Sequence, residues 1–193
     1  MSAKPVHIQV LGASGSGKTT LGRALAEDLR CPHIDSDEFF WLPTVPPFQT
    51  VRPSEERLRL LREALEASAS WVLSGGLCGW SDTFIPRFDL VVFVWIPQEL
   101  RMHRLHQREI ARYGPAALEP GGSRHEDYKS FMAWAAGYDD GDITTQSRRM
   151  HETWLGQLSC PVLRLEKDMT TPQQLAAVRV ALQGEPGASA PKP

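Results

Sequence analysis

The sequence predicts an α/β domain built around a mostly parallel sheet. Signals typical of strands and of helices alternate along the chain, which is the pattern of such domains. The run over residues 90–96 is continuous, apolar and β-branched, as expected for a strand covered on both faces. A glycine-rich segment over residues 12–19 separates a strand-like run from a helix-like one. Together these three observations favour a layered α/β fold.

The first elements surround the glycine-rich segment. Residues 7–12 form an apolar run that predicts a short buried strand. Residues 19–29 place leucines on one face of a predicted helix. Pro32 breaks that helix, and residues 32–35 predict a short second strand.

A proline-rich segment and a second helix come next. Residues 41–53 contain four prolines, which predicts a loop or mobile segment. Ser54 is expected to be the N-cap of a helix through about residue 67, because leucines recur there at helical spacing. Residues 71–74 predict a third strand, which Gly75 and Gly76 end.

The alternation continues after the strand at residues 90–96. Pro97 begins a predicted helix to about residue 113, and residues 114–122 form a break that contains glycine and proline. A second helical stretch over about residues 125–158 is expected to be interrupted near Gly141.

The chain is expected to form one domain. Residues 161–165 predict the last strand, and Thr171 opens a final helix. Residues 1–184 therefore make a single predicted domain with a lid at about residues 113–130. Residues 185–193 are small and proline-rich, which predicts a disordered tail.

The glycine-rich segment fits G-x-x-x-x-G-K-[ST], the pattern of a phosphate-binding loop. Its backbone N–H groups and the following helix N-terminus can form a concave anion site. Lys18 can reach the β- and γ-phosphates of a nucleotide, and the Thr19 hydroxyl can ligate Mg²⁺. A Gly/Ser-rich surface turn before a helix is the alternative. The residues expected to hold the nucleotide are Gly12, Ala13, Ser14, Gly15, Ser16, Gly17, Lys18, Thr19 and Thr20.

Two acidic residues follow the second predicted strand. Ligands of open parallel sheets bind at the carboxyl ends of the strands, so Asp35 and Asp37 should share an edge with the glycine-rich loop. If the strand continues, both carboxylates point the same way. One can hold Mg²⁺ or its water, and the other can bind a substrate hydroxyl and accept its proton. A solvated acidic loop, or an N-cap for residues 38–40, is the alternative.

Glycines and arginines complete the set of candidate residues. Gly75 and Gly76 would let a substrate or the γ-phosphate approach the backbone closely, although a plain tight turn explains them as well. Arg104 and Arg108 lie on one helical face and can contact a transferring phosphoryl group. Arg124 is a candidate lid residue.

Two more arginines share the helical face of Arg104 and Arg108, which is called the arginine face below. Arg101 and Arg112 lie on it as well, since the four residues are spaced by 3, 4 and 4 positions. A surface helix that carries basic residues without a catalytic purpose is the alternative.

These features together resemble the small P-loop kinases of the adenylate, shikimate and gluconate kinase grouping, over roughly residues 6–182. The resemblance implies a P-loop NTPase fold with three α/β/α layers, a five-stranded parallel sheet and a helical lid. Asp35-Ser36-Asp37 is similar to the D-x-D of shikimate and gluconate kinases, which implies Asp35 for Mg²⁺ and Asp37 for the acceptor hydroxyl.

The resemblance extends to three further segments. Ser74-Gly75-Gly76 is similar to the glycine segment that lines the shikimate kinase acceptor site. Residues 104–108 resemble the R-x-x-x-R at the start of the lid in nucleotide kinases. Residues 167–172 fall where these families wrap the adenine.

A narrower similarity concerns two aromatic segments. Residues 37–41 and 131–138 resemble segments of poorly characterised bacterial P-loop proteins that are often labelled adenylate-kinase-like or DNA topology modulation proteins. Proteins of that kind usually have Asp-Gly-Asn after the third strand, where this chain has Ser74-Gly75-Gly76.

Departures from these families bear on the acceptor. The Asp-Gly-x-Pro-Arg segment of adenylate kinase is missing, so AMP is not the expected acceptor. Arg52 and Arg87 are the nearby candidates for anion binding. Trp41, Phe48 and Trp80 suggest an apolar or ring-shaped acceptor, and core packing or loop clamping explains the same aromatic residues equally well.

Composition limits the other possibilities. The chain of 193 residues has 21 basic and 23 acidic side chains, and this near-neutral balance argues against a nucleic-acid partner. No run of 18 apolar residues and no signal-peptide pattern occurs, so neither a membrane span nor secretion is expected, and we expect a cytoplasmic location.

The sequence therefore predicts an ATP- and Mg²⁺-dependent phosphotransferase that acts on a small hydroxylated or nucleotide-like acceptor. We expect a monomer or a homodimer. An NTP hydrolase or a nucleotide-driven switch with a protein or nucleic-acid partner is the alternative.

Overall fold

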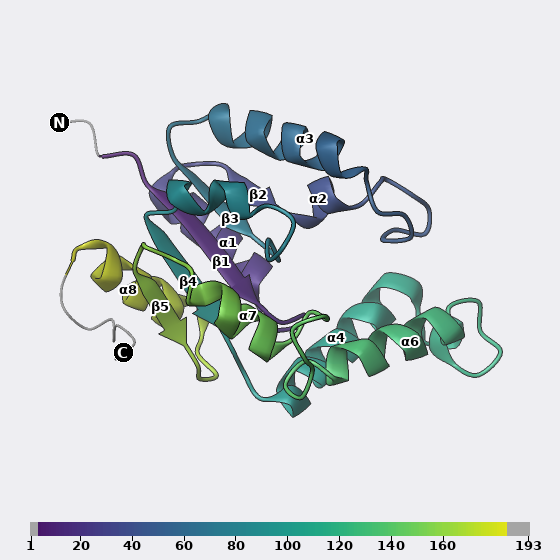
Figure 1. The fold of residues 1–193 in the computed structure, drawn as a ribbon. Coiled ribbons are helices and arrows are strands. Elements are labelled where there is room, and N and C mark those ends of the chain that lie inside the picture. The colour runs from purple at the N-terminus through teal and green to yellow at the C-terminus, as the bar shows by residue number, and fades with distance from the viewer. Residues whose placement is uncertain (1–3, 185–193) are drawn as a thin grey trace.

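A computed structural model describes residues 4–184 of the chain (Figure 1), and the predicted tail at residues 185–193 lies outside them. Five strands form one parallel sheet in the order β2-β3-β1-β4-β5, as the sequence predicts. The strands are β1 (His7–Gly12), β2 (His33–Asp35), β3 (Trp71–Ser74), β4 (Leu90–Val94) and β5 (Val162–Leu165).

Helices occupy most of the remaining described chain. They are α1 (Lys18–Leu29), α2 (Asp37–Phe40), α3 (Ser54–Glu66), α4 (Gln98–Tyr113), α5 (Pro115–Leu118), α6 (His125–Ala136), α7 (Arg148–Leu155) and α8 (Thr171–Leu182), with a 3₁₀ helix at Asp82–Arg87. None of the helices within residues 4–184 combines the length and the apolar character that crossing a membrane requires.

The central strands are buried on both faces, which produces the three predicted layers. In β4, Leu90 and Val92 pack with the leucines of α1 and with α8 on one side of the sheet. Val91 and Phe93 point the other way, toward a second cluster that includes α3 and α7. Because successive side chains of a strand alternate between faces, the continuous apolar run supplies both clusters.

The helices α4 and α6, which flank the predicted lid at about residues 113–130 and are called the lid helices below, project from one end of this layered core (Figure 1). There α4 and α6 pack against each other, and α5 lies within the predicted break at residues 114–122. The predicted interruption near Gly141 is confirmed, because α6 ends at Ala136 and α7 begins at Arg148. The helix α7 packs on the sheet, so the second helical stretch is divided between lid and core.

Two predicted boundaries were wrong, by one and by two residues. Ser54 is the first residue of α3 and Pro53 is its N-cap, with no side-chain cap bond. The strand β4 ends at Val94 although the apolar run continues to Ile96, because Pro97 begins the turn into α4.

Arg101 corrects the interpretation of the arginine face. Its side chain is fully buried, and its guanidinium donates to Asp139 at 2.6 Å and to the Ala135 carbonyl at 3.1 Å. The same guanidinium lies 5.0 Å from the centre of the Tyr138 ring. Arg101 therefore joins the start of α4 to the end of α6 and is withdrawn from the phosphate side of the helix.

We predict that Arg101→Met lowers the free energy of unfolding by about 3 kcal/mol, because it leaves Asp139 and a buried carbonyl without their partner. Urea denaturation measures the change. Arg59→Met is the matched control, since Arg59 forms an exposed pair with Glu63 and should change the value by less than about 1 kcal/mol. Equal losses in the two variants would refute a structural role for Arg101.

Candidate functional site

The glycine-rich loop connects β1 to α1 at the carboxyl edge of the sheet. Gly15 has φ +79°, and a Cβ atom on it would lie 2.7 Å from the backbone oxygen of Arg101. Only glycine fits there, so the loop packs directly on the first turn of α4. The N-cap Gly17 provides no side-chain hydrogen bond, and the first turn of α1 has no acidic residue. The first amides of α1 are therefore open to an anion.

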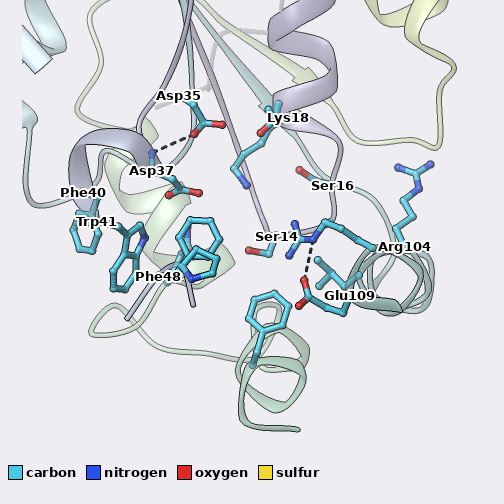
Figure 2. A pocket seen from close by; sticks show the side chains of 18 of the residues that line it. Ser14, Ser16, Lys18, Asp35, Asp37, Phe40, Trp41, Phe48, Arg104 and Glu109 are labelled. Atoms are coloured by element: carbon cyan, nitrogen blue, oxygen red, sulfur yellow. Dashed lines mark hydrogen bonds and ion pairs between the residues drawn. The ribbon is translucent and has the colours of Figure 1, made fainter. Parts of the chain in front are cut away.

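Lys18 and two carboxylates face the same space (Figure 2). Burial lowers the pKa of Lys18, and the nearby charges of Asp37 and Asp35 oppose this shift. Burial raises the pKa of Asp37, against the opposing effect of Lys18. Both charged forms are thus disfavoured in the cleft, a state that a bound polyphosphate would reverse for the lysine.

The second strand does not extend to Asp37, although the expected direction of the two carboxylates required it to continue. The strand β2 ends at Asp35 and the short helix α2 begins at Asp37, whose N–H donates to Asp35 Oδ1 at 3.1 Å. The two carboxylates still line one cleft, because the turn folds back on itself. Local hydrogen bonding by an aspartate favours such a turn over continued strand.

The donor atoms present fit a magnesium nucleotide. Ser16 Oγ is buried and has no hydrogen-bond partner among the described residues, which suits a site for phosphate oxygens. Thr19, Asp35 and Asp37 offer the oxygen ligands that Mg²⁺ takes from proteins. Within residues 4–184, no three His, Cys, Asp or Glu side chains gather to hold a metal alone. Phosphate oxygens and water would therefore complete the shell of the ion.

The two glycines after β3 have different surroundings. Gly75 has φ +119°, and a Cβ atom there would lie 1.9 Å from Ser36 Oγ. It brings the ends of β2 and β3 together and does not line the cleft, whereas Gly76 does. Gly75 thus acts through packing, and only Gly76 lies where a ligand can approach.

The remaining arginines of α4 line the cleft with different partners. Arg104 donates to Asp168 at 3.0 Å, which ties α4 to the loop after β5. Arg108 and Arg112 both contact Oε1 of Glu109, at 3.2 and 3.6 Å. Glu109 is 6 % exposed, so this carboxylate is buried with the two cations around it. Figure 2 shows its side chain among those that line the cleft.

The structure separates the other predicted arginines. Arg124 lines the cleft, pairs with Asp127 at 2.8 Å and lies over the Tyr113 ring. Arg52 also lines the cleft, but its guanidinium donates to Glu56 and to the backbone carbonyls of residues 38, 39 and 41. It therefore clamps the proline-rich loop.

Arg87 does not reach the cleft and is a correction to the predicted set of acceptor residues. Its guanidinium pairs with Glu66 at 2.8 Å and lies over the Phe84 ring. The 3₁₀ helix that carries it packs against the sheet through Phe84, and this turns the arginine toward α3.

Aromatic side chains form one wall of the cleft, next to Asp37 (Figure 2). The Trp41 ring makes edge contacts with Phe40 and Phe48, with centroids 5.0 and 6.2 Å apart. Phe40 also contacts Trp80 at 5.6 Å, and Arg57 lies over both rings. Trp41, Phe48 and Trp80 line one cleft, and their role toward an acceptor stays a prediction. Nothing in the sequence indicated that Arg57 would join them.

Sequence reasoning also missed a buried histidine. His151 on α7 lines the cleft, and its Nδ1 lies 2.7 Å from the Tyr138 hydroxyl. Burial and the nearby charge of Lys18 lower the pKa of His151 to about 4. The signal available was that His151 shares a helical face with Trp154 and Leu155, but nothing local indicated which face of the sheet α7 covers.

The cleft is large enough for two ligands. Its volume is about 1550 Å³, against roughly 300–1,000 Å³ for typical small-molecule sites. It runs from the loop after β5 past the glycine-rich loop to the aromatic wall. The end of the cleft near the loop after β5 is lined by Met169, Thr170, Thr171 and Gln174. The first three of these residues belong to the predicted adenine segment at residues 167–172.

Three solved structures with this fold are shikimate kinases or a putative kinase. A shikimate kinase from Bacteroides thetaiotaomicron matches with a TM-score of 0.55 and 22% identity, covering 92% of this chain and 98% of that one. The shikimate kinase from Acinetobacter baumannii in complex with shikimate gives 0.56 and 16%, covering 95% and 96%. A putative kinase from Chloroflexus aurantiacus gives 0.51 and 20%, covering 94% and 97%. These matches confirm the predicted kinase-like P-loop fold.

Two sequence comparisons show which proteins the chain is related to. It is 44% identical over 172 residues to the uncharacterized protein YqaC of Bacillus subtilis (strain 168), which covers 89% of this chain and 94% of that protein. The family model AAA_18, described as an AAA domain, matches residues 8–127. Because this match spans more than half of the chain, the protein belongs to the AAA_18 family of AAA domains.

Proposed function

We propose that this protein is an ATP-dependent phosphotransferase that moves the γ-phosphate to a small hydroxylated or nucleotide-like acceptor. The observation that carries the proposal is the joint position of Lys18 and Asp37, each within reach of the other's charge in one two-ligand cleft. The AAA domain and the kinase-like fold support nucleotide-dependent phosphotransfer in general.

The donor nucleotide would use the uncapped amides of α1 and the ammonium of Lys18 for its phosphates. Its base would lie toward Met169 and Gln174, which line the far end of the cleft. Thr19 and Asp35 would hold Mg²⁺, which when bound neutralises charge on the β- and γ-phosphates.

The acceptor would lie between Asp37 and the aromatic wall. Its oxygen forms a bond to the γ-phosphorus while the bond from that phosphorus to the β-bridging oxygen breaks, and ADP leaves. The acceptor proton passes to the Asp37 carboxylate, whose raised pKa makes it a better base than an ordinary aspartate. Arg104, Arg108 and Arg124 line the same cleft and would stabilise the transferring charge.

The aromatic wall supports an acceptor with a flat or apolar ring. Trp41 and Phe48 belong to the proline-rich loop, and Phe48 is 44% exposed although it faces the cleft. Because the Phe48 ring is exposed, it is not needed to fill the protein core and can stack against the ring of a ligand bound near Asp37. A hydrolase needs only water as its second substrate, so this wall favours the transferase over the hydrolase.

The acceptor is found by measuring ADP formation with ATP alone and with a panel of nucleosides, nucleotides, sugars and polyol acids. We expect one chemical class to raise turnover at least tenfold and to become phosphorylated. ATP hydrolysis that no member of the panel raises would point instead to the NTP hydrolase or switch.

We predict that Lys18→Ala reduces ATP turnover by about 10²–10³-fold, because one preorganised cation is lost from the phosphates. Circular dichroism should be unchanged, since Lys18 makes no ion pair among the described residues. Lys129→Ala, on an exposed position of α6, is the control and should keep full turnover. Normal turnover by folded Lys18→Ala protein would disprove the scheme.

We predict that Asp37→Asn lowers acceptor-dependent turnover by about 10²-fold or more while Mg·ATP affinity is retained, because the base is lost. The wild-type rate should fall as the pH drops through the raised pKa of Asp37, at a pH above the usual aspartate value of about 3.9. The variant should lack this acidic limb. Glu38→Gln is the control, and an unchanged acidic limb in Asp37→Asn would assign it to another group.

A further inference from the structure

His151 is a buried titratable residue that the reaction scheme leaves unused. Its side chain is fully buried on α7, with the ring against Phe93 of β4 at a centroid distance of 6.2 Å. It also lines the cleft, close enough to Lys18 for that charge to affect its protonation. The imidazole therefore borders the cleft in the neighbourhood of Lys18.

The two ring nitrogens have different surroundings. Nδ1 lies 2.7 Å from the Tyr138 hydroxyl, and Nε2 is buried without a hydrogen-bond partner among residues 4–184. A buried nitrogen without a partner costs free energy, so natural proteins keep such an atom for a purpose or satisfy it with a ligand.

One of the two neutral tautomers of His151 leaves fewer polar groups without a hydrogen-bond partner. If the Tyr138 O–H donates to Nδ1, the hydroxyl proton is used and only the Nε2–H of His151 lacks a partner. If Nδ1–H donates instead, the Tyr138 proton and the Nε2 lone pair are both without partners. Burial keeps the tyrosine pKa above its ordinary value, so its proton is available. The first arrangement leaves fewer polar groups unsatisfied, and it makes Nε2–H a donor.

The charge state of the ring agrees with this assignment. The pKa of His151 is lowered to about 4 by burial and by Lys18, against the weaker effect of Glu152. At neutral pH the imidazole is therefore uncharged and adds no second cation beside the lysine. A hydrogen bond from such a neutral N–H is strongest to an anionic oxygen, and the charge of Lys18 favours an anion in this part of the cleft.

We propose that His151 donates its Nε2–H to an oxygen of the γ-phosphoryl group beside Lys18, with Tyr138 as the positioning residue that sets the tautomer. The inference rests on the proposed function, because it assumes a triphosphate in the cleft. It predicts that the protein distinguishes a triphosphate from a diphosphate through this contact.

The direct test is nitrogen NMR of ¹⁵N-histidine-labelled full-length protein. We expect His151 to be neutral with the proton on Nε2, and we expect its Nε2 resonance to shift on adding Mg²⁺ with adenosine 5′-(β,γ-imido)triphosphate. Mg·ADP should leave that resonance nearly unchanged. A proton on Nδ1, or equal responses to both nucleotides, would overturn the proposal.

Calorimetry with substituted proteins gives an independent readout. His151→Phe should weaken binding of the imido-triphosphate by about tenfold or more, as loss of a hydrogen bond to a charged group does, and leave Mg·ADP affinity within about twofold. His151→Gln, whose amide can donate from nearly the same place, should recover most of the affinity. It also keeps the test valid if the phenylalanine variant does not fold.

Two further variants separate positioning from packing. Tyr138→Phe should preserve the fold and weaken triphosphate binding less than His151→Phe does, with part of the Nε2–H population lost in the NMR spectrum. His103→Gln, at an exposed position of α4, is the control and should behave as wild type. Equal triphosphate affinity in wild type, His151→Phe and His151→Gln would overturn the proposal.

The proposed function and the proposed role of His151 can be rejected separately. If wild-type protein binds neither Mg·ADP nor the imido-triphosphate, the proposed function itself is wrong. If both bind and the His151 resonance and variants show no difference between them, the transferase remains and only the role of His151 is rejected.

Discussion

The backbone contact between the glycine-rich loop and the start of α4 is the constraint on which the site depends. A Cβ atom at Gly15 would lie 2.7 Å from the Arg101 carbonyl oxygen, and one at Gly12 would lie 2.4 Å from that of Val94. The loop is thereby fixed to the end of β4 and to the first turn of the lid helix. Arg101 extends this connection, since its buried guanidinium holds the end of α6 through Asp139. The loop that positions Lys18 is therefore in direct contact with both the sheet and the first turn of α4.

The pKa values of the charged groups in the cleft are shifted mainly because these groups are buried. Burial moves the pKa of Lys18 down and that of Asp37 up, so each group is less firmly charged than in water. His151 is held neutral by the same burial and by the same lysine. A bound triphosphate would raise the pKa of Lys18 again and so favour its charged form, whereas the raised pKa of Asp37 suits proton transfer from an acceptor. One desolvated cleft can thus supply both a cation for binding and a base for chemistry.

Local sequence signals predicted the parts of this protein that depend on local structure. The five strands, the glycine-rich loop and the helix after it follow from apolar runs and from glycine spacing, and the structure has them at nearly the predicted residues. Side-chain roles that depend on distant partners could not be predicted in this way. Arg101 shares a helical face with Arg104, yet it is buried because Asp139 lies opposite it 38 positions later.

The same limit explains the acceptor side. Nothing near Arg52 or Arg87 in the sequence shows that one clamps the proline-rich loop and the other pairs with Glu66. The Tyr138–His151 contact spans the gap between lid and core, so it appears only when α7 is packed on the sheet. The predicted roles of the cleft residues remain predictions, because placing side chains in one cleft does not test their chemistry.

Charge accounting on the lid gives a physical reason for a strongly anionic ligand. Arg108 and Arg112 both contact one oxygen of Glu109, and a single carboxylate balances only one of these two guanidinium groups. Each cation also lies over an aromatic ring, Arg108 over Phe131 and Arg112 over Phe48. These ring contacts hold the guanidinium groups without neutralising them. The lid wall therefore retains excess positive charge facing the cleft, and a polyphosphate bound at the glycine-rich loop would supply the missing negative charge.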